Sequence, residues 1–318
     1  MSTTLFELRV EGMTDAIPVS AFQAIEKVNH TGRLTATCSV SLRALETAPL
    51  LHRGATLVVA GSPEGPRSFH GVITRQAELA HGGSELVLEP RLSALARTRR
   101  WRIFHGLDVV ALARTLLEEH HVPFRAQLFD SYAPRSHWAQ RGESDLALLQ
   151  RALEEEGIFF YFDHAQTPGP GATEVLVLGD RVESHATTLK GRGFRCAAAQ
   201  EQLQPGDERV LLDARAESRA RAERAVARRH DFTRPRTPPV HDAVAKGRDA
   251  GVDQPSGLID AHATDDDSAL PVEREARARL DAERADAETL SATSVFARLS
   301  PGQIIALDDG RRARSTKS

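Results

Sequence analysis

The stretch from Glu143 to Phe162 constrains the fold most, because it carries the signals of a helix, a stop and a strand in succession. Ser144 or Asp145 can cap the helix, since a short side-chain oxygen accepts hydrogen bonds from the first free backbone N–H groups. Gly157 stands where the helix should end in a left-handed residue, which glycine adopts without steric cost. The run Ile158–Phe162 has the bulk and branching of a buried strand. The sequence therefore predicts a capped helix, a glycine stop and a strand.

Aliphatic side chains recur every three or four residues along this predicted helix. The apolar stripe consists of Leu146, Leu148, Leu149, Ala152 and Leu153. Arg151 and the run Glu154–Glu156 fall largely on the opposite side. We therefore expect a core along the leucine side and solvent around the glutamates.

The composition sets broad limits on the class of protein. A length of 318 residues is enough for two or three domains. The formal net charge of -3 demands neither nucleic acid nor an anionic membrane as a partner. No apolar run reaches the ~20 residues that span a bilayer, and the N-terminus lacks the features of a Sec signal. Cys38 and Cys196 lie far apart, and we expect both to be reduced. The sequence predicts synthesis in the cytoplasm and no stable membrane insertion.

The first hundred residues read mostly as strands. Phe6, Leu8 and Val10 alternate with polar neighbours, as in a half-buried strand. Further strands are expected at 35–42, 56–60, 69–74 and 85–88. Turn signals separate them. Short strands at these intervals predict a barrel or a sandwich.

A basic run follows, in which arginines flank Trp101. Its arginines are Arg97, Arg99, Arg100 and Arg102. A nucleic-acid patch would use the guanidinium groups for phosphates and the indole for stacking. A solvated connection would instead use Trp101 as an anchor to the core. The run is short and the net charge is negative, which favours the connection.

The middle of the chain contains a second helical pattern at 108–119. Shifted by 37 residues onto 145–156, it matches six of twelve positions. Either a helix–strand unit is duplicated, or two amphipathic helices have converged on good helix formers. Strands are expected at 124–129 and 174–178, on either side of the second helix and its strand. These elements predict an α+β unit.

The remaining third of the chain gives weaker signals. A strand is expected at 210–214, followed by an arginine-rich segment at 218–229. Residues 243–257 are loop-like. Alanines at helical spacing predict a solvated helix at 273–288. The end, 308–318, is polar and basic.

Patterns that could carry chemistry are weak. Successive glutamates at 154–156 point in different directions along a helix, which disfavours an acid–base pair. The neighbouring histidines His120 and His121 diverge in the same way, and no second pair has metal-ligand spacing. The acidic run Asp265–Asp267 lacks the glycine and the distal glutamate of a calcium loop. We therefore assign no catalytic, cofactor-binding or metal-binding residues and expect no enzyme and no cofactor.

The segment ESDLALLQRALEEEGIFFYF at 143–162 resembles the signature of the VgrG family, the spike hub of type VI secretion and kin of phage tail hub proteins such as phage late control D. Other segments are similar to the same family. They are RGATLVV at 53–59, RSFHGVITR at 67–75, LSALARTRRWRIF at 92–104, HDFTRP at 230–235 and SVFARLSPGQIIAL at 294–307. The similarity is close over residues 5–180 and looser over 181–307.

This resemblance implies a β-rich α+β fold with two β-barrel-like hub domains and a helix-containing α+β insert between them. The implied domains are a first barrel at 1–102, a middle domain at 103–180, a second barrel-like domain at 181–307 and a polar tail at 308–318. It also implies a homotrimer seated on a tube of hexameric, Hcp-like rings, with baseplate proteins as partners. Assembly at the baseplate is implied, and secretion by contraction stays open.

The family carries a C-terminal needle after the hub, and the sequence-based expectation is that this chain lacks it. A separately encoded spike or effector then becomes a candidate partner, and we expect the trimer to be weak by itself. Two alternatives stay open: a phage or phage-like tail baseplate hub, and a degenerate monomeric binding module of the same fold.

Overall fold

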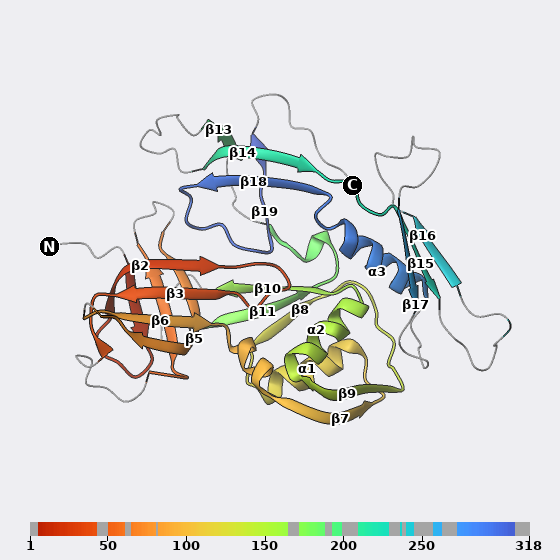
Figure 1. Ribbon diagram of the computed structural model, residues 1–318, viewed down its shortest axis with the longest axis horizontal. Helices are drawn as coiled ribbons and strands as arrows, with labels where there is room; N and C mark the ends of the chain where they lie inside the picture. The colour runs from red at the N-terminus through yellow and green to blue at the C-terminus, as the bar shows by residue number, and fades with distance from the viewer. Residues whose placement is uncertain are drawn as a thin grey trace.

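The computed structural model of the protein describes most of the chain. The described residues are 6–42, 50–60, 65–80, 82–164, 172–187, 193–198, 209–228, 236, 240–244, 257–262 and 272–308. Figure 1 shows a β-barrel beside a helix-containing middle unit, with strand-rich C-terminal parts above and to the right. The prediction of a strand-rich α+β fold with a helical insert between β-rich parts is confirmed.

The N-terminal strands form a closed barrel in the order β1-β2-β3-β6-β5-β4. They are β1 (Phe6–Val10), β2 (Ile17–Ile25), β3 (Arg33–Cys38), β4 (Gly54–Val59), β5 (Arg67–Glu78) and β6 (Ser84–Glu89). Alternate side chains fill the interior, including the fully buried Leu8, Leu57 and Ile73. Burial raises the pKa of the Cys38 thiol to about 11, against a weaker opposing effect of a hydrogen bond with Ser84. Cys38 is therefore an inert core residue.

The middle unit packs two helices against a small sheet. Its elements are the 3-10 helix η2 (Arg91–Arg97), β7 (Arg99–His105), α1 (Val109–Glu119), β8 (Phe124–Gln127), β9 (His137–Ser144), α2 (Asp145–Glu155), β10 (Phe159–His164) and β11 (Glu174–Gly179). The sheet order is β10-β11-β8, and β7 pairs with β9. The apolar faces of both helices share one core with Phe160 and Phe162 of β10.

The predicted helix, stop and strand are present. The Ser144 hydroxyl accepts a hydrogen bond from the Ala147 N–H at 3.1 Å, so Ser144 rather than Asp145 is the N-cap. Gly157 has φ +72°, and the Ile158 N–H returns to the Leu153 carbonyl at 2.8 Å. The chain then continues directly into β10.

The caps, the ends and the buried positions of the two helices correspond at an offset of 36 residues, not 37. Their caps are Asp108 and Ser144, and both helices end in a left-handed residue, His121 or Gly157. Buried positions also repeat at 36: 109, 112, 113, 116 and 117 in α1, and 145, 148, 149, 152 and 153 in α2. The sequence match at 37 was therefore in the wrong register, and duplication remains a hypothesis.

The expected anchoring of Trp101 in the core is wrong. Residues 99–105 form β7, whose side chains alternate between the helices and the solvent. Trp101 lies on the outer side and is 80% exposed. The predicted boundary after residue 102 falls inside this strand, and the domain limits stay predictions.

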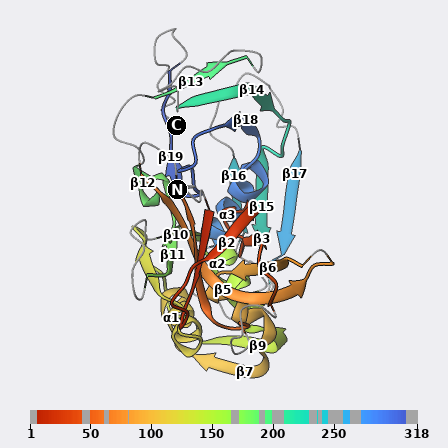
Figure 2. The ribbon, with the colours of Figure 1, turned by 90° about the vertical axis from the view of Figure 1, so that its left-hand side faces the viewer.

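The C-terminal third contains two sheets and short bridging pieces. Its elements are η3 (Val182–Ser184), β12 (Ala186–Thr187), β13 (Phe194–Ala197), β14 (Val210–Ser218), β15 (Arg224–Arg228), β16 (Val240–Val244), β17 (Leu258–His262), α3 (Val272–Arg284), β18 (Glu288–Ser294), β19 (Gln303–Ile304) and β20 (Leu307–Asp308). One sheet has the order β18-β14-β13-β20 and the other β16-β15-β17, while β12 pairs with β19. Figure 2 shows the first sheet at the opposite end of the molecule from β7 and β9.

One prediction in this part needs correction. The helix expected at 273–288 spans Val272–Arg284, and it is not simply solvated, because Val272, Ala276 and Leu280 are buried. In the segment 294–307, a turn at Pro301–Gly302 leads into β19, and β20 begins at Leu307. The segments 230–235 and 265–267 lie outside the described residues. Within the described part, the structure has no helix long and apolar enough to cross a membrane.

The buried side of α2 gives a direct stability test. Leu149 is fully buried and Phe160 is 2% exposed. We expect Leu149→Asp or Phe160→Asp to unfold the middle unit, with a loss of at least about 4 kcal/mol, because each variant buries a charge and leaves a void. Thermal unfolding followed by circular dichroism measures the loss. The exposed Glu154→Asp change in the same helix is the control, and wild-type stability in either core variant would contradict this placement of the core.

Candidate functional site at the junction of barrel and sheet

The residue Asn29, in the turn between β2 and β3, joins the barrel to the middle sheet. Its backbone N–H donates to the Phe160 carbonyl at 2.8 Å, and its side-chain oxygen accepts from the Phe160 N–H at 2.8 Å. Asn29 therefore satisfies both backbone groups of one β10 residue. It does so with φ +58°, a conformation that asparagine adopts more readily than most residues.

Arg67 connects the barrel to the C-terminal segment. The side chain is only 7% exposed and pairs with Glu26 of the β2–β3 turn. It also donates to the carbonyl of Ala297 at 2.7 Å and to that of Leu299. Burial lowers the pKa of Arg67, while the charge of Glu26 opposes that shift. A buried guanidinium is tolerated only where its charge and its donors are matched, so this position fixes the C-terminal segment against the barrel.

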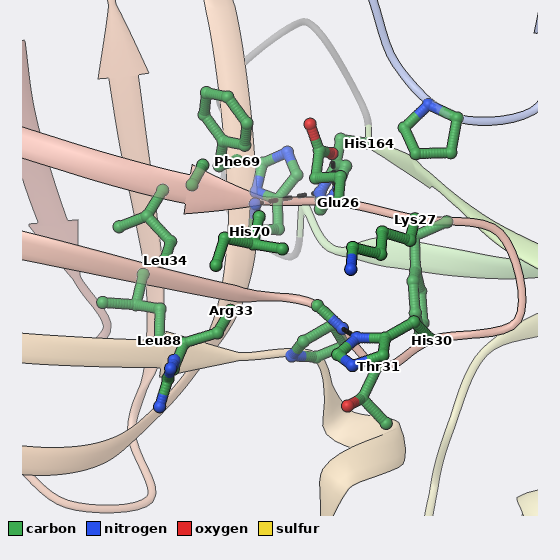
Figure 3. A pocket seen from close by; sticks show the side chains of 16 residues that line it. Glu26, Lys27, His30, Thr31, Arg33, Leu34, Phe69, His70, Leu88 and His164 are labelled. Carbon is green, nitrogen blue, oxygen red and sulfur yellow. Dashed lines mark hydrogen bonds and ion pairs between the residues drawn. The ribbon is translucent and has the colours of Figure 1, made fainter. Parts of the chain in front are cut away.

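Two histidines lie near Glu26, the partner of Arg67; Figure 3 shows Glu26 together with His70 and His164. The His70 backbone N–H donates to His164 Nδ1 at 3.1 Å, and His164 Nε2 lies 3.4 Å from a Glu26 carboxylate oxygen. The Nδ1 atom is thus an acceptor, which assigns the ring proton to Nε2, facing Glu26. The His70 ring is 2.8 Å from the Thr56 hydroxyl. Both ring nitrogens of His164 and the Nδ1 atom of His70 thus have structural contacts.

The pocket beside these histidines is small. It is lined by Lys27, His30, Phe69 and Pro301 among others, and its volume is about 40 Å³. Ligand sites for small molecules usually measure about 300–1,000 Å³. The space therefore suits a few water molecules rather than a substrate.

The turn at Pro301–Gly302 closes over β10. A methyl group placed on Gly302 would lie 2.4 Å from the Tyr161 ring, so only glycine fits there. The Tyr161 hydroxyl donates to the Ser184 carbonyl at 3.1 Å. His185 stacks on Phe159 at 4.6 Å between ring centres. Two segments that the sequence identified separately, 143–162 and 294–307, thus meet at one contact.

A second charged cluster lies beneath β7. Asp145 is fully buried and receives hydrogen bonds from Gln140 at 2.7 Å and from Arg102 at 3.1 Å. His120 Nε2 lies 2.8 Å from its other oxygen. Burial by itself would raise the pKa of Asp145, but these hydrogen bonds and the charges of Arg102 and Arg100 lower it overall. His120 is therefore a partner of a buried carboxylate.

The expectation that all three glutamates at 154–156 face solvent is wrong for Glu156. Its side chain is 1% exposed and pairs with Arg135 at 3.1 Å and with Arg274 of α3 at 3.3 Å. Burial raises the pKa of Glu156, and the two arginines oppose that shift. Arg135 lies over the Trp138 ring at 3.8 Å. The glutamate thus joins α2 to α3.

The polar clusters described above pair their side chains with one another and with backbone groups. Within the described ranges, no group of three or more histidine, cysteine, aspartate or glutamate side chains is placed to bind a metal ion. The assignment of no catalytic, cofactor or metal residues stays a prediction. Sequence reasoning missed Asn29, Arg67 and Arg135, because their partners lie far away in the chain. For Asn29, the turn-forming run NHTG was the only local signal.

Comparison with known proteins identifies the family. The profile described as phage tail baseplate hub (GPD) matches residues 25–317.

The chain belongs to the phage tail baseplate hub family.

Curated relatives agree with this assignment. The hub chain is 29% identical over 270 residues to the type VI secretion system spike protein VgrG4b of Pseudomonas aeruginosa, covering 81% of this chain and 32% of the relative. It is 30% identical over 262 residues to VgrG5 of the same organism, covering 79% of this chain and 31% of the relative. The chain thus spans about a third of the length of these relatives.

Solved structures share the fold. The E. coli c3393 protein, described as a component of the type VI secretion system, aligns with a TM-score of 0.63 at 20% identity, over 96% of this chain and 68% of its own. A 43 kDa tail protein of prophage MuSo2 from Shewanella oneidensis aligns with a TM-score of 0.60 at 12% identity, over 96% of this chain and 88% of its own. Both likenesses show the barrel, insert and C-terminal sheets as a common architecture.

The Arg67–Glu26 pair predicts a measurable coupling. We expect Arg67→Met to cost about 3 kcal/mol, because it removes the guanidinium that pairs with the partly buried Glu26 carboxylate. Glu26→Gln should destabilise the Arg67→Met variant less than it destabilises the wild type. The difference, measured by urea titration, is the coupling energy, and we expect about 1–3 kcal/mol. The exposed pair Arg9–Glu7 is the matched control, with coupling under about 1 kcal/mol. Coupling no greater than that of the control would contradict the role of Arg67.

The Asp145 cluster predicts a pH dependence. The pKa of Asp145 in the folded protein lies below the ordinary value of 3.8. The ionised carboxylate therefore contributes its full stabilisation of the fold above pH 3.8, and this contribution is lost as the pH falls through the folded-state pKa. Asp145→Asn should therefore be less stable than wild type at neutral pH, and the two thermal midpoints should converge as the pH falls below 3.8. Asp163→Asn, at an exposed position, serves as control. A constant difference across the pH range would refute the ionised, paired carboxylate.

Proposed function

We propose that this chain is a structural hub of a contractile injection machine, of the type VI secretion kind. In this role it assembles as a homotrimer, is seated on a tube of hexameric, Hcp-like rings and contacts baseplate proteins. Sheath contraction drives it outward. The match of residues 25–317 to the hub family is the observation that carries this proposal.

The internal construction supports a mechanical role. Asn29 joins the barrel to the middle sheet, Arg67 joins it to the C-terminal segment, and Glu156 joins α2 to α3. These contacts use backbone groups and buried charges, which tolerate little change in geometry. A hub that transmits force from a sheath to a tip needs such rigid connections. No catalytic step is part of the proposal.

A phage or phage-like tail baseplate hub is the second candidate, and the fold shared with prophage tail proteins supports it. The identities near 30% are to secretion spike proteins, which favours the secretion machine. A separately encoded spike or effector as partner remains a prediction, as does secretion by contraction. The degenerate monomeric module stays the alternative of a different class.

Solution mass tests the trimer. We expect light scattering across a concentration series to give the 34.7 kDa chain at low concentration and three times that mass at high concentration. The dependence follows because a closed trimer forms by mass action between identical surfaces. A tight trimer at sub-micromolar concentration would contradict the expected weakness of the assembly. A monomer at every concentration would contradict the trimer itself and favour the monomeric module.

A further inference from the structure

The β7–β9 ribbon has two chemically different faces. On the inner face, Arg100 and Arg102 reach the carboxylate of Glu119 at 2.8 Å, and Arg102 also reaches Asp145. The cationic groups on this side are therefore matched by acids of the helices. The arginines of the inner face therefore need no partner from another protein.

The outer face is both apolar and basic. Trp101 is 80% exposed and Ile103 is 61% exposed. The strand register places Arg141 opposite Trp101. Arg97, Arg99 and Arg141 are exposed and form no ion pair within the part of the chain that the structure describes. We call Arg99, Trp101, Ile103 and Arg141 the β7 outer face.

The indole of Trp101 is held in place although it is exposed. Gly142 lies beneath it, and a methyl group on that glycine would lie 3.1 Å from the ring. The absence of a side chain at Gly142 thus lets the ring lie against the backbone of β9. An ordered ring loses little conformational freedom on binding, which is why tryptophan and arginine are frequent at the centres of protein interfaces.

The outer edge of β7 offers backbone N–H and C=O groups that another strand can pair with. Among the described strands, β7 pairs with β9 and with no other. In Figures 1 and 2 the ribbon lies at the periphery of the molecule, away from the barrel and from the C-terminal sheets. An edge strand with exposed tryptophan and isoleucine invites pairing unless something covers it. An extended segment can add to such an edge through main-chain hydrogen bonds.

We propose that the β7 outer face docks an extended acidic segment of another protein, which pairs along β7 and covers Trp101 and Ile103. Charge complementarity predicts an acidic occupant. The arginines of the outer face lack acidic partners in the described structure, whereas Arg100 and Arg102 on the inner face are paired with Glu119 and Asp145. A single aromatic ring followed by Ile103 is a poor stacking platform for successive bases. The test measures peptide binding at Trp101 and not the mass of the oligomer, so its failure is distinguishable from a failure of the hub proposal.

The intrinsic fluorescence of the protein provides the readout. The chain has two tryptophans, and Trp138 is buried at 1% exposure, so a blue shift of the exposed emission reports on Trp101. The probe is a peptide of roughly eight residues that alternates glutamate with valine, matching the proposed strand. We expect a saturable blue shift that weakens as salt is added. The same peptide with lysine in place of glutamate should give no shift.

Charge-reversal variants test whether the peptide binds at the β7 outer face. Arg99→Glu combined with Arg141→Glu should weaken binding at least about tenfold, because both charges that attract the peptide are reversed. Arg9→Glu combined with Arg215→Glu, at exposed positions on β1 and β14, should leave the affinity within about twofold. No shift with the acidic peptide, or equal affinity in both double variants, would overturn the proposal. So would a shift produced instead by oligothymidylate or by phosphatidylglycerol vesicles.

Discussion

The buried pairing of arginine with carboxylate is the interaction on which the arrangement of this hub depends. Arg67 with Glu26 fixes the C-terminal segment to the barrel, and Arg274 with Glu156 fixes α3 to the end of α2. Removing a guanidinium from water is costly, and only close geometry with full hydrogen bonding offsets that cost. Such pairs therefore tolerate one relative placement of their elements. Apolar packing at the same junctions would permit sliding, since it is not directional.

This construction separates two kinds of surface. Inside, Asp145 and Glu156 neutralise the arginines that surround them, so the charges serve the fold. Outside, the arginines beside Trp101 have no acidic partner in the described structure. The same residue type is thus structural on one face of β7 and available for recognition on the other. For a machine component, whose function lies in its contacts, this distinction matters more than any pocket.

Local signals predicted local structure well. The cap at Ser144, the stop at Gly157 and the strand that follows depend on neighbouring residues, and all three are present. The barrel strands followed from the alternation of apolar and polar side chains. The errors concern residues whose burial depends on partners far away in the sequence. Glu156 was expected in solvent because its partner Arg274 is 118 residues away, and Trp101 was expected in the core because apolar residues are usually buried there.

The sequence by itself determined the elements, the fold class and the family resemblance, because hydrophobic periodicity and capping are short-range properties. Only the tertiary structure decided which side of β7 faces the helices, and that Gly302 lies against Tyr161. It also decided the register of the two helices, 36 residues rather than 37, because burial against a shared core outweighs the identity of individual side chains. Contacts between distant segments form only when the intervening chain folds back and brings them together, and no local sequence pattern specifies this.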